Sequence, residues 1–421
     1  MNHDLYLSEH LKRTSTARAF IYLVWGSLLL LLLTWFLSHG ENVSVTFFRD
    51  SRDTGMDFFN SICHTDGRVP YTAYSTLYPP LANLFFFSLR SMLPESVPVA
   101  DTQGMRQWQA PMLLFILFIL LSALLSIAIY QRFHGSRCDN GRFPTACLLC
   151  FGNLYAFERG NIILVALLLT VFFFAFYESK NRLLAELALI SLALAAGLKI
   201  YPALFGLALL KEKRWKQAGR AIAYGIACFA LPFFAFEGVE GICVFFGQLV
   251  RMNTDPAALY GSIGISGIMM PVMKVIGKLT EIPLALQDAV AWAIKILVIL
   301  ILLASFCSSK KKWQQYLDLT LLLVLLQTSY YYTLSFFLIP FIAYCKEENR
   351  VEKANIAAFV FFMIVLLPYP AFTIHGVYET RYLLVIMAMA ASVIGEAINV
   401  YKDLSHVLKP LQVQPRRNRE R

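Results

Sequence analysis

Long apolar segments separated by short polar connectors run through almost the entire chain. A helix needs about 20 apolar residues to cross a bilayer, because its backbone amides must bond to one another inside the hydrocarbon. The pattern predicts an all-α polytopic membrane protein with about 12 spans, several of them short or broken. These predicted spans lie near residues 19–38, 112–130, 144–157, 161–177, 183–198, 200–210, 221–236, 284–306, 315–329, 333–345, 354–370 and 381–400.

Composition supports this class. The 421 residues are 58% hydrophobic and 15% charged, with a mean hydropathy of +0.58, which excludes an ordinary water-soluble domain. The net charge of +10 does not indicate nucleic-acid binding, because the lysines and arginines form short runs between apolar segments. The scattered cysteines, including Cys147 and Cys150, are interpreted as small hydrophobic residues.

The basic runs instead predict which connectors lie in the cytoplasm. Lys12, Arg13 and Arg18 precede the first span and place the N-terminus inside. Alternation then places the later runs on the same side, near residues 132–142, 180–182, 211–220, 310–312 and 346–353. We expect a cytoplasmic N-terminus at 1–18, one transmembrane domain at 19–400 and a basic cytoplasmic tail at 401–421.

This alternation requires the chain to reverse near Lys199 and Pro202, since a single helix there would leave the basic run at 211–220 outside. Proline supports the break, because it removes a backbone donor and restricts the residue before it. The segment 261–278 is apolar but carries two lysines. It is interpreted as an interfacial or re-entrant helix, because a full span would move Lys310 to Lys312 outside.

The predicted outer loop from residue 39 to 111 is where chemistry is expected. It contains five basic and seven acidic residues, interleaved with aromatics and prolines, and is far longer than a connector needs to be. Asp57 lies in it, with Asp50 and Asp53 close upstream. Asp66 precedes Gly67 and is typical of a turn, while His64 with Asp66 lacks a third metal ligand.

Several segments together resemble a known family. The order "DFFN", "GRVPYTAYSTLYPPL", "ERGNIILVALLL", "GLKIYPALFGLALLKEKRW" and "SYYYTLSFFLIP" is similar to the family 87 glycosyltransferases of the GT-C superfamily, over roughly residues 20 to 400. These are bacterial membrane enzymes that include the mycobacterial mannosyltransferase acting on phosphatidylinositol mannosides. One departure is that the last segment reads Tyr330-Tyr331-Tyr332, where some members place a histidine.

The resemblance implies a GT-C-type bundle in the bacterial cytoplasmic membrane, with its active site on the extracytoplasmic face. It implies inverting transfer of a sugar from a polyprenyl-phosphate donor to a lipid or glycan acceptor. Mannose is the first expectation, with glucose and arabinofuranose open. Carried over, the acid of the first outer loop is the base, which is Asp57 in this chain.

The chemistry of such a transfer suggests the remaining candidates. A base takes the proton of the acceptor hydroxyl, and fixed cations stabilise the leaving phosphate. The donor carries one phosphate, so no metal is expected. Candidate phosphate-binding cations are Lys199, Arg159, Arg251 and Arg381, and candidate sugar or acceptor contacts are Tyr71, Tyr78, Tyr201, Tyr331 and His375. Snorkelling cations and an interfacial aromatic belt are the ordinary alternatives for these residues.

Two other functions remain open from the sequence. Short broken helices and intramembrane charges also mark transporters and lipid flippases, although no inverted repeat is visible and the charges collect at one face. The third interpretation is a non-catalytic membrane subunit of an envelope-polymer machine, in which the outer loop would tolerate loss of its acids.

Overall fold

The computed structural model describes residues 3–41, 45–48, 53–135, 141–253, 255–259, 261–280, 283–348, 350–353, 355–374 and 378–408. The helices of the first half of the chain are α1 (His3–Leu37), α3 (Met56–Cys63), η1 (Asp66–Arg68), α4 (Pro80–Arg90), α5 (Thr102–Met105), α6 (Gln109–His134), α7 (Arg142–Leu148), α8 (Phe151–Arg159), α9 (Ile163–Phe176), α10 (Arg182–Leu198), η2 (Tyr201–Gly206) and α11 (Leu207–Lys211).

The second half continues the helical pattern and adds a two-residue antiparallel pair of strands. Its elements are α12 (Trp215–Ala230), η3 (Leu231–Ala235), α13 (Gly238–Met252), α14 (Pro256–Leu259), α15 (Ile265–Thr280), α16 (Leu284–Ser308), α17 (Lys312–Leu326), η4 (Tyr331–Phe337), α18 (Leu338–Glu347), α19 (Ile356–Leu366), β1 (Thr373–Ile374), β2 (Tyr378–Glu379) and α20 (Thr380–Leu408). The predicted all-α class is confirmed.

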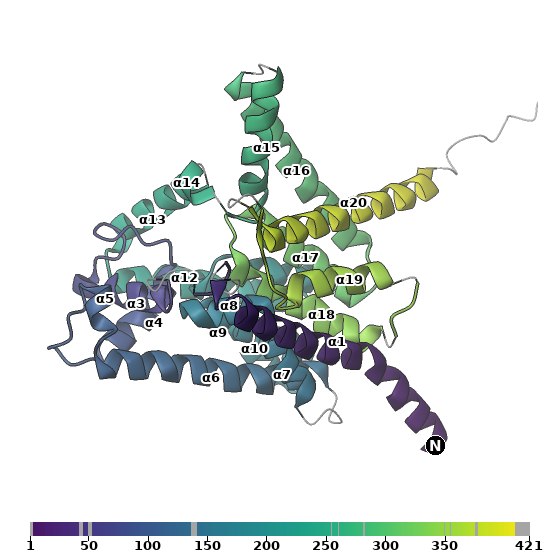
Figure 1. Cartoon of the computed structure of the whole chain (residues 1–421), viewed down its shortest axis with the longest axis horizontal. Coiled ribbons are helices and arrows are strands. Elements are labelled where there is room, and N and C mark those ends of the chain that lie inside the picture. Colours follow the sequence, from purple (N-terminus) through teal and green to yellow (C-terminus); the bar gives the residue numbers. More distant parts are fainter. Residues whose placement is uncertain are drawn as a thin grey trace, which may run out of the picture.

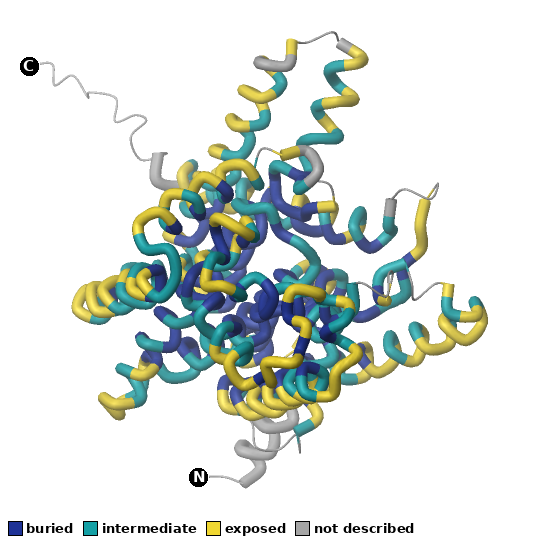
Figure 2. Tube along the Cα trace, turned by 90° about the vertical axis from the view of Figure 1, so that its left-hand side faces the viewer, coloured by how far each residue is buried: buried dark blue, intermediate teal, exposed yellow. Residues whose placement is uncertain are grey.

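Five described helical stretches are long and apolar enough to cross a membrane: Thr16–Leu37, Gln109–His134, Trp215–Ala235, Leu286–Ser308 and Thr380–Ser405. Much of their apolar surface is exposed. Figure 2 shows exposed residues, in yellow, along helices on the outside of the molecule. A bilayer covers such surface, so the protein is a polytopic membrane protein.

Shorter helices fill the centre of the bundle. Residues 315–325 of α17 and 338–345 of α18 are all buried. A helix that is apolar around most of its circumference is stabilised when other helices surround it. Both of these stretches are surrounded in this way. Figure 2 shows that buried residues, in dark blue, gather at the centre of the molecule.

Several predicted spans are broken where the backbone leaves helical geometry. The predicted helix at 144–157 is α7 followed by α8, because Cys150 is extended (φ −65°, ψ 150°). The predicted segments at 200–210 and 333–345 each begin as a 3₁₀ helix, η2 and η4, before continuing as α11 and α18. Half-length helices of this kind are tolerated where neighbouring protein surrounds them.

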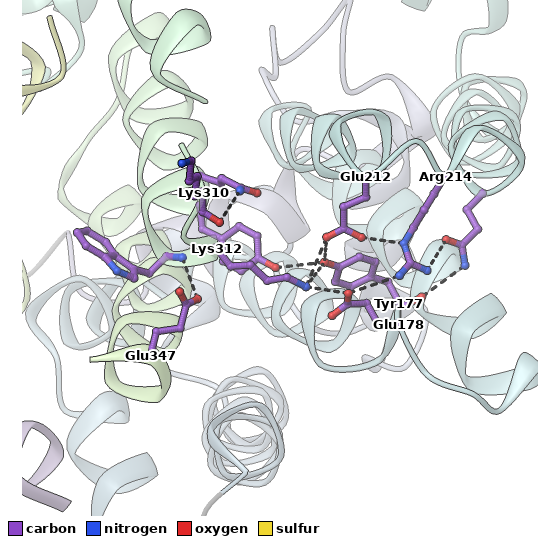
Figure 3. Close-up of polar contacts among 11 residues, drawn as sticks. Tyr177, Glu178, Glu212, Arg214, Lys310, Lys312 and Glu347 are labelled. Carbon is purple, nitrogen blue, oxygen red and sulfur yellow. Dashed lines mark hydrogen bonds and ion pairs between the residues drawn. The ribbon is translucent and has the colours of Figure 1, made fainter. Parts of the chain in front are cut away.

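One end of the bundle gathers the connectors predicted to be cytoplasmic. Figure 3 shows Lys312 bridging Glu178 and Glu212, at 2.7 and 3.5 Å. Tyr177 donates a hydrogen bond to Glu212 at 2.7 Å, and Arg214 pairs with the same carboxylate at 2.7 Å. Three basic connectors distant in sequence therefore meet on the same side.

The first span begins at this end too. The Thr16 hydroxyl donates to the backbone carbonyl of Glu348 at 3.0 Å, and Lys311 pairs with the carboxylate of Glu348. The N-terminal segment and the predicted cytoplasmic connectors at 310–312 and 346–353 therefore share one end of the molecule.

The predicted chain reversal is confirmed. α10 ends at Leu198, Lys199 is extended (φ −145°, ψ 126°), and Pro202 lies in the first turn of η2. The chain then returns through α11 to Glu212, which bonds to Tyr177 at the opposite end of the bundle. Lys199 accordingly lies at the end of the bundle opposite the polar contacts of Tyr177, Glu212 and Lys312.

The segment predicted to be interfacial or re-entrant forms α15. It pairs with α16, and the two helices project together from the remaining bundle at the top of Figure 1. Pro271 lies inside α15, and this helix is not among the five described stretches long enough to span. Its place relative to the membrane surface stays a prediction.

Cysteine labelling tests the sidedness of the two ends. In a background with the exposed Cys243 and Cys307 replaced by serine, we expect Ser91→Cys to react with an impermeant maleimide in intact cells. Lys310→Cys should react only after permeabilisation. Both positions are exposed, so access to reagent is the only difference. Labelling of both from the same side would contradict the predicted topology.

Candidate active site

Asp57 lies in the first turn of α3, where the chain approaches the end of α8. The backbone amide of Gly55 donates to the carbonyl of Glu158 at 2.7 Å and joins the two helices. Arg159 Nε and Nη2 donate to Asp57 Oδ2 and Oδ1, at 3.0 and 3.3 Å, and Asn161 Nδ2 donates to Oδ2 at 2.7 Å. The carboxylate is therefore held in one orientation, with Oδ1 retaining the greater free acceptor capacity.

The turn after α8 creates this arrangement. Gly160 has φ +65°, which non-glycine residues rarely adopt, and it places Arg159 and Asn161 on the same carboxylate. Asn161 is buried and its Oδ1 accepts from the Ile163 amide at 2.9 Å, which fixes the side-chain amide. A Cβ at residue 160 would lie 2.7 Å from Phe58 Cβ.

A cavity of about 320 Å³ opens beside this carboxylate. Asp57 and Lys199 both line it, although 142 positions of sequence separate them. Asp57 belongs to one wall and Lys199 to a second. The third wall comes from the segment between α17 and η4 and from the start of η4. The polar and aromatic lining residues are Asp57, Asn60, Ser61, His64, Ser75, Thr76, Tyr78, Lys199, Tyr201, Gln327, Thr328, Tyr332 and Thr333.

Close packing of α8 on η4 positions the third wall. A Cβ at Gly152 would lie 2.5 Å from the backbone nitrogen of Ser335, so only glycine permits this approach. The contact allows Tyr332 to stack near Tyr155, with ring centroids 6.4 Å apart. The aromatic segment thus lies against the helix that carries Arg159.

Lys199 is a buried cation in the turn after α10. Its Nζ lies 4.1 Å from the ring centre of Tyr78 and 5.5 Å from that of Tyr332. Burial lowers its pKa to about 7, and the charge of Asp57 partly opposes this. Lys199 forms no ion pair with any residue that the structure describes, so its ammonium is available to an anionic ligand at the cavity.

The tyrosines separate into two groups. Tyr78, Tyr201 and Tyr332 line the cavity, and the buried hydroxyl of Tyr201 has no hydrogen-bond partner among the described residues. Tyr71 does not line it, because its ring is buried against Phe233 and Phe245. The predicted sugar contact at Tyr71 is therefore corrected to a packing role.

Tyr331 is corrected in the same way. Its hydroxyl donates to Glu379 Oε2 at 2.8 Å, and its ring packs on Phe151 and Tyr155. Glu379 also accepts from Thr46 at 2.5 Å, which ties the first outer loop to the aromatic segment. Tyr331 holds the aromatic segment in place through these contacts, whereas its neighbour Tyr332 lines the cavity.

The predicted arginine contacts with phosphate also need correction. Arg159 is hydrogen-bonded to Asp57 and lies 3.9 Å from Asp53, so its positive charge is paired with these carboxylates rather than directed into the cavity. Arg381 is fully buried, lies 3.7 and 3.9 Å from the ring centres of Phe151 and Tyr369, and donates to backbone carbonyls. Neither these side chains nor Arg251, exposed on α13, line the cavity.

Other residues singled out from the sequence have ordinary surroundings. Asp66 begins η1, followed by Gly67 at φ +63°, and its carboxylate lies 3.7 Å from Arg90. His64 stacks on Tyr74 at 5.3 Å and also lines the cavity. Within the described ranges, no three His, Cys, Asp or Glu residues form a group able to hold a metal. His375 and Asp50 lie outside the described residues.

Sequence reasoning missed Asn161 as a member of the site, and within the aromatic run 330–332 it selected Tyr331, whereas Tyr332 lines the cavity. Asn161 stood within the quoted "ERGN" segment, two residues after Arg159, and Tyr332 within the aromatic run. The available signal was a polar side chain immediately after a glycine at a predicted helix end. Which tyrosine of three faces the cavity depends on η4, whose 3₁₀ geometry the sequence pattern does not show.

The fold and cavity define an all-α membrane protein with one partly buried carboxylate, Asp57, and one buried ammonium, Lys199, on the walls of a shared pocket. The family model of glycosyltransferase family 87 matches residues 76–329. The chain therefore belongs to this family and is a glycosyltransferase. No curated protein and no solved structure was found to match it.

The turn that carries Arg159 and Asn161 can be tested by Gly160→Ala. We expect a loss of about 2–4 kcal/mol of stability, because alanine is strained at positive φ and its methyl would overlap Phe58 and Phe115. Thermal unfolding in detergent measures the change.

Gly219→Ala is the matched control, since a Cβ there meets nothing within 4 Å and lies inside α12. We expect this variant to be neutral or slightly stabilised. Equal unfolding temperatures for both variants would contradict the packing argument.

Proposed function

We propose that this glycosyltransferase moves a sugar, mannose in the first instance, from a polyprenyl-phosphate donor to a hydroxyl of a lipid or glycan acceptor. Transfer inverts the anomeric centre and takes place on the extracytoplasmic face of a bacterial cytoplasmic membrane. The observation that carries the proposal is that Asp57 and Lys199 line the same cavity. One group suits the incoming hydroxyl, and the other suits the departing phosphate.

Asp57 serves as the base. The acceptor oxygen attacks the anomeric carbon, its proton passes to Asp57 Oδ1, and the bond between the anomeric carbon and the phosphate oxygen breaks. Oδ1 suits this task because its contact with Arg159 is long, at 3.3 Å, whereas Oδ2 already accepts two bonds. Arg159 and Asn161 are positioning residues that aim the carboxylate.

Lys199 stabilises the leaving group. The phosphate departs with the bonding electron pair, and its growing negative charge is met by an ammonium already removed from bulk water. Tyr78 and Tyr332 flank Lys199 and present ring faces toward it, and Tyr201 adds an unpartnered hydroxyl to the wall. These aromatic groups suit the apolar faces of a sugar ring.

The orientation follows from the charge asymmetry of the two ends. The polar contacts among Tyr177, Glu212 and Lys312 lie at the end of the bundle where the positive-inside rule predicts cytoplasm. The cavity lies at the other end of α10, which supports an extracytoplasmic active site.

Asp57→Asn tests the base. We expect transfer to fall at least about 100-fold, because an amide accepts no proton from the attacking hydroxyl. The assay follows sugar transfer from a polyprenyl-phosphate mannose to a membrane glycolipid fraction, and thermal unfolding verifies that the variant is folded. Asp66→Asn is the matched control, since Asp66 belongs to the same loop without lining the cavity. Undiminished transfer by Asp57→Asn would remove the assignment.

The pH profile tests Lys199. A pKa lowered to about 7 means that the side chain is protonated below pH 7 and loses its charge as the pH rises through this value. We therefore expect kcat/KM for the donor to decline above pH 7 in the wild type. Lys199→Arg keeps its charge, so the decline should move to higher pH. A profile unchanged by this substitution would contradict a role in phosphate binding.

A chelator tests the further proposal that protein cations suffice without a metal. Pre-incubation with EDTA should leave the transfer rate within about twofold, because the donor has a single phosphate that Lys199 can neutralise. Activity lost to EDTA and regained with Mg²⁺ would overturn this part of the proposal.

A further inference from the structure

The segment 69–79, which connects η1 to α4, borders the catalytic cavity without a helix or strand of its own. Ser75 in this segment has φ +52°, a conformation that residues with a side chain rarely adopt. A turn of this kind persists when contacts from outside over-determine it. Here those contacts come from the start of α13 and from α13 itself, which are distant in the sequence.

Glu237, the residue immediately before α13, supplies most of these contacts. Its Oε1 accepts hydrogen bonds from the Thr72 amide and the Thr72 hydroxyl, both at 2.7 Å. The Tyr71 amide lies 3.2 Å from each carboxylate oxygen and donates to both. Gln248 Nε2 adds a hydrogen bond to the Tyr71 carbonyl at 3.1 Å. Hydrogen bonds to a carboxylate are roughly twice as strong as neutral ones, so Glu237 fixes the backbone at residues 71 and 72.

Tyr71 connects this anchored backbone to Tyr78. The Tyr71 side chain is fully buried and packs on Phe233 and Phe245. The Tyr71 hydroxyl donates to the Tyr78 carbonyl at 3.2 Å and accepts from Asn83 Nδ2 at 3.0 Å. The position of the Tyr78 backbone is therefore set by a side chain that does not line the cavity.

Tyr78 in turn contacts residues on two walls of the cavity. Its ring centre lies 4.1 Å from Lys199 Nζ, an ammonium that Tyr332 of η4 also faces, at 5.5 Å. The Tyr78 hydroxyl accepts from Asn161 Nδ2 at 3.4 Å, and the same nitrogen donates to Asp57 Oδ2 at 2.7 Å. A displacement of Tyr78 would therefore change the surroundings of the ammonium and of the carboxylate together.

We propose that Glu237 is a positioning residue of this glycosyltransferase, which acts from outside the cavity through Tyr71 to hold Tyr78 against Lys199. Tyr71 shares this role, in addition to its packing. The inference rests on the proposed function, in which Lys199 meets the donor phosphate. It adds that the arrangement of the cavity depends on a carboxylate at the start of α13.

Competitive acetylation with acetic anhydride measures the titration of Lys199 without any sugar transfer, because mass spectrometry follows the modification of each lysine against pH. The wild type should show a midpoint near pH 7, since burial lowers the pKa of Lys199 to about 7. For Glu237→Ala and Tyr71→Phe we expect a midpoint higher by about one pH unit, because a displaced Tyr78 admits water to the ammonium. None of the groups that face Lys199 is itself changed in these variants.

Steady-state kinetics with polyprenyl-phosphate mannose gives the second readout. We expect kcat to fall about tenfold for Glu237→Ala, the scale of a small misplacement of reacting groups. The decline of kcat/KM at high pH should move together with the acetylation midpoint. The double variant Glu237→Ala/Tyr71→Phe should lose no more than the more affected single variant, because both substitutions act through Tyr78.

Two variants are matched controls. Glu240→Ala removes an exposed carboxylate in the first turn of α13. Tyr344→Phe removes a buried hydroxyl that donates to the Asn355 carbonyl at 3.4 Å. Neither should move the acetylation midpoint or kcat. Tyr71→Phe keeps its ring packing, so it tests the inference even where Glu237→Ala fails to fold.

A lower unfolding temperature with an unchanged Lys199 midpoint would reduce Glu237 and Tyr71 to structural residues and overturn the inference. Additive losses of kcat in the double variant would also contradict it, because they would indicate two independent effects. A midpoint that moves as expected, in a protein whose wild type transfers no sugar from the polyprenyl-phosphate donor, would support the positioning role and contradict the proposed function alone.

Discussion

The ion pair between Asp57 and Arg159 is the constraint on which the active-site geometry depends. It joins α3 of the first outer loop to the end of α8, and Asn161 completes the set of donors. Charges removed from water are costly unless each meets a partner with good geometry. Here the pair is bidentate, so Asp57 can remain at a cavity wall without moving toward solvent. Loss of Arg159 would leave Asp57 with Asn161 alone, and loss of Asp57 would leave Arg159 with only the longer contact to Asp53 at 3.9 Å.

Unlike Asp57, Lys199 has no oppositely charged partner in an ion pair among the described residues. Burial has removed its hydration, the rings of Tyr78 and Tyr332 lie near its ammonium, and the charge of Asp57 acts on it without forming an ion pair. Such a cation gains more from an arriving anion than a solvated lysine does, because the low dielectric strengthens the new contact. The pocket therefore contains one carboxylate, Asp57, that is paired with Arg159, and one ammonium, Lys199, that forms no ion pair with a described residue.

Rigid packing around the pocket converts these side chains into a defined site. The buried stretches 315–325 of α17 and 338–345 of α18 form the core, and Gly152 lets α8 lie directly against η4. Glu379 ties the first outer loop to Tyr331 through two hydrogen bonds. At the far end, Lys312, Glu178 and Glu212 close the bundle with charged contacts (Figure 3). The site thus rests on helices fixed at both ends.

The sequence by itself determined the class of the protein, the reversal near Pro202 and the end of the bundle at which Asp57, Lys199, Tyr78 and Tyr201 lie. Hydrophobic length and charge asymmetry control these features, and both can be read along the chain. Only the tertiary structure decided which of those residues meet. Arg159 and Arg381 look alike in sequence, as arginines near helix ends, yet one orients Asp57 and the other is enclosed by Phe151 and Tyr369. Side-chain direction depends on the glycine turn at 160 and on the 3₁₀ geometry of η4, which arise from packing between distant segments rather than from local pattern.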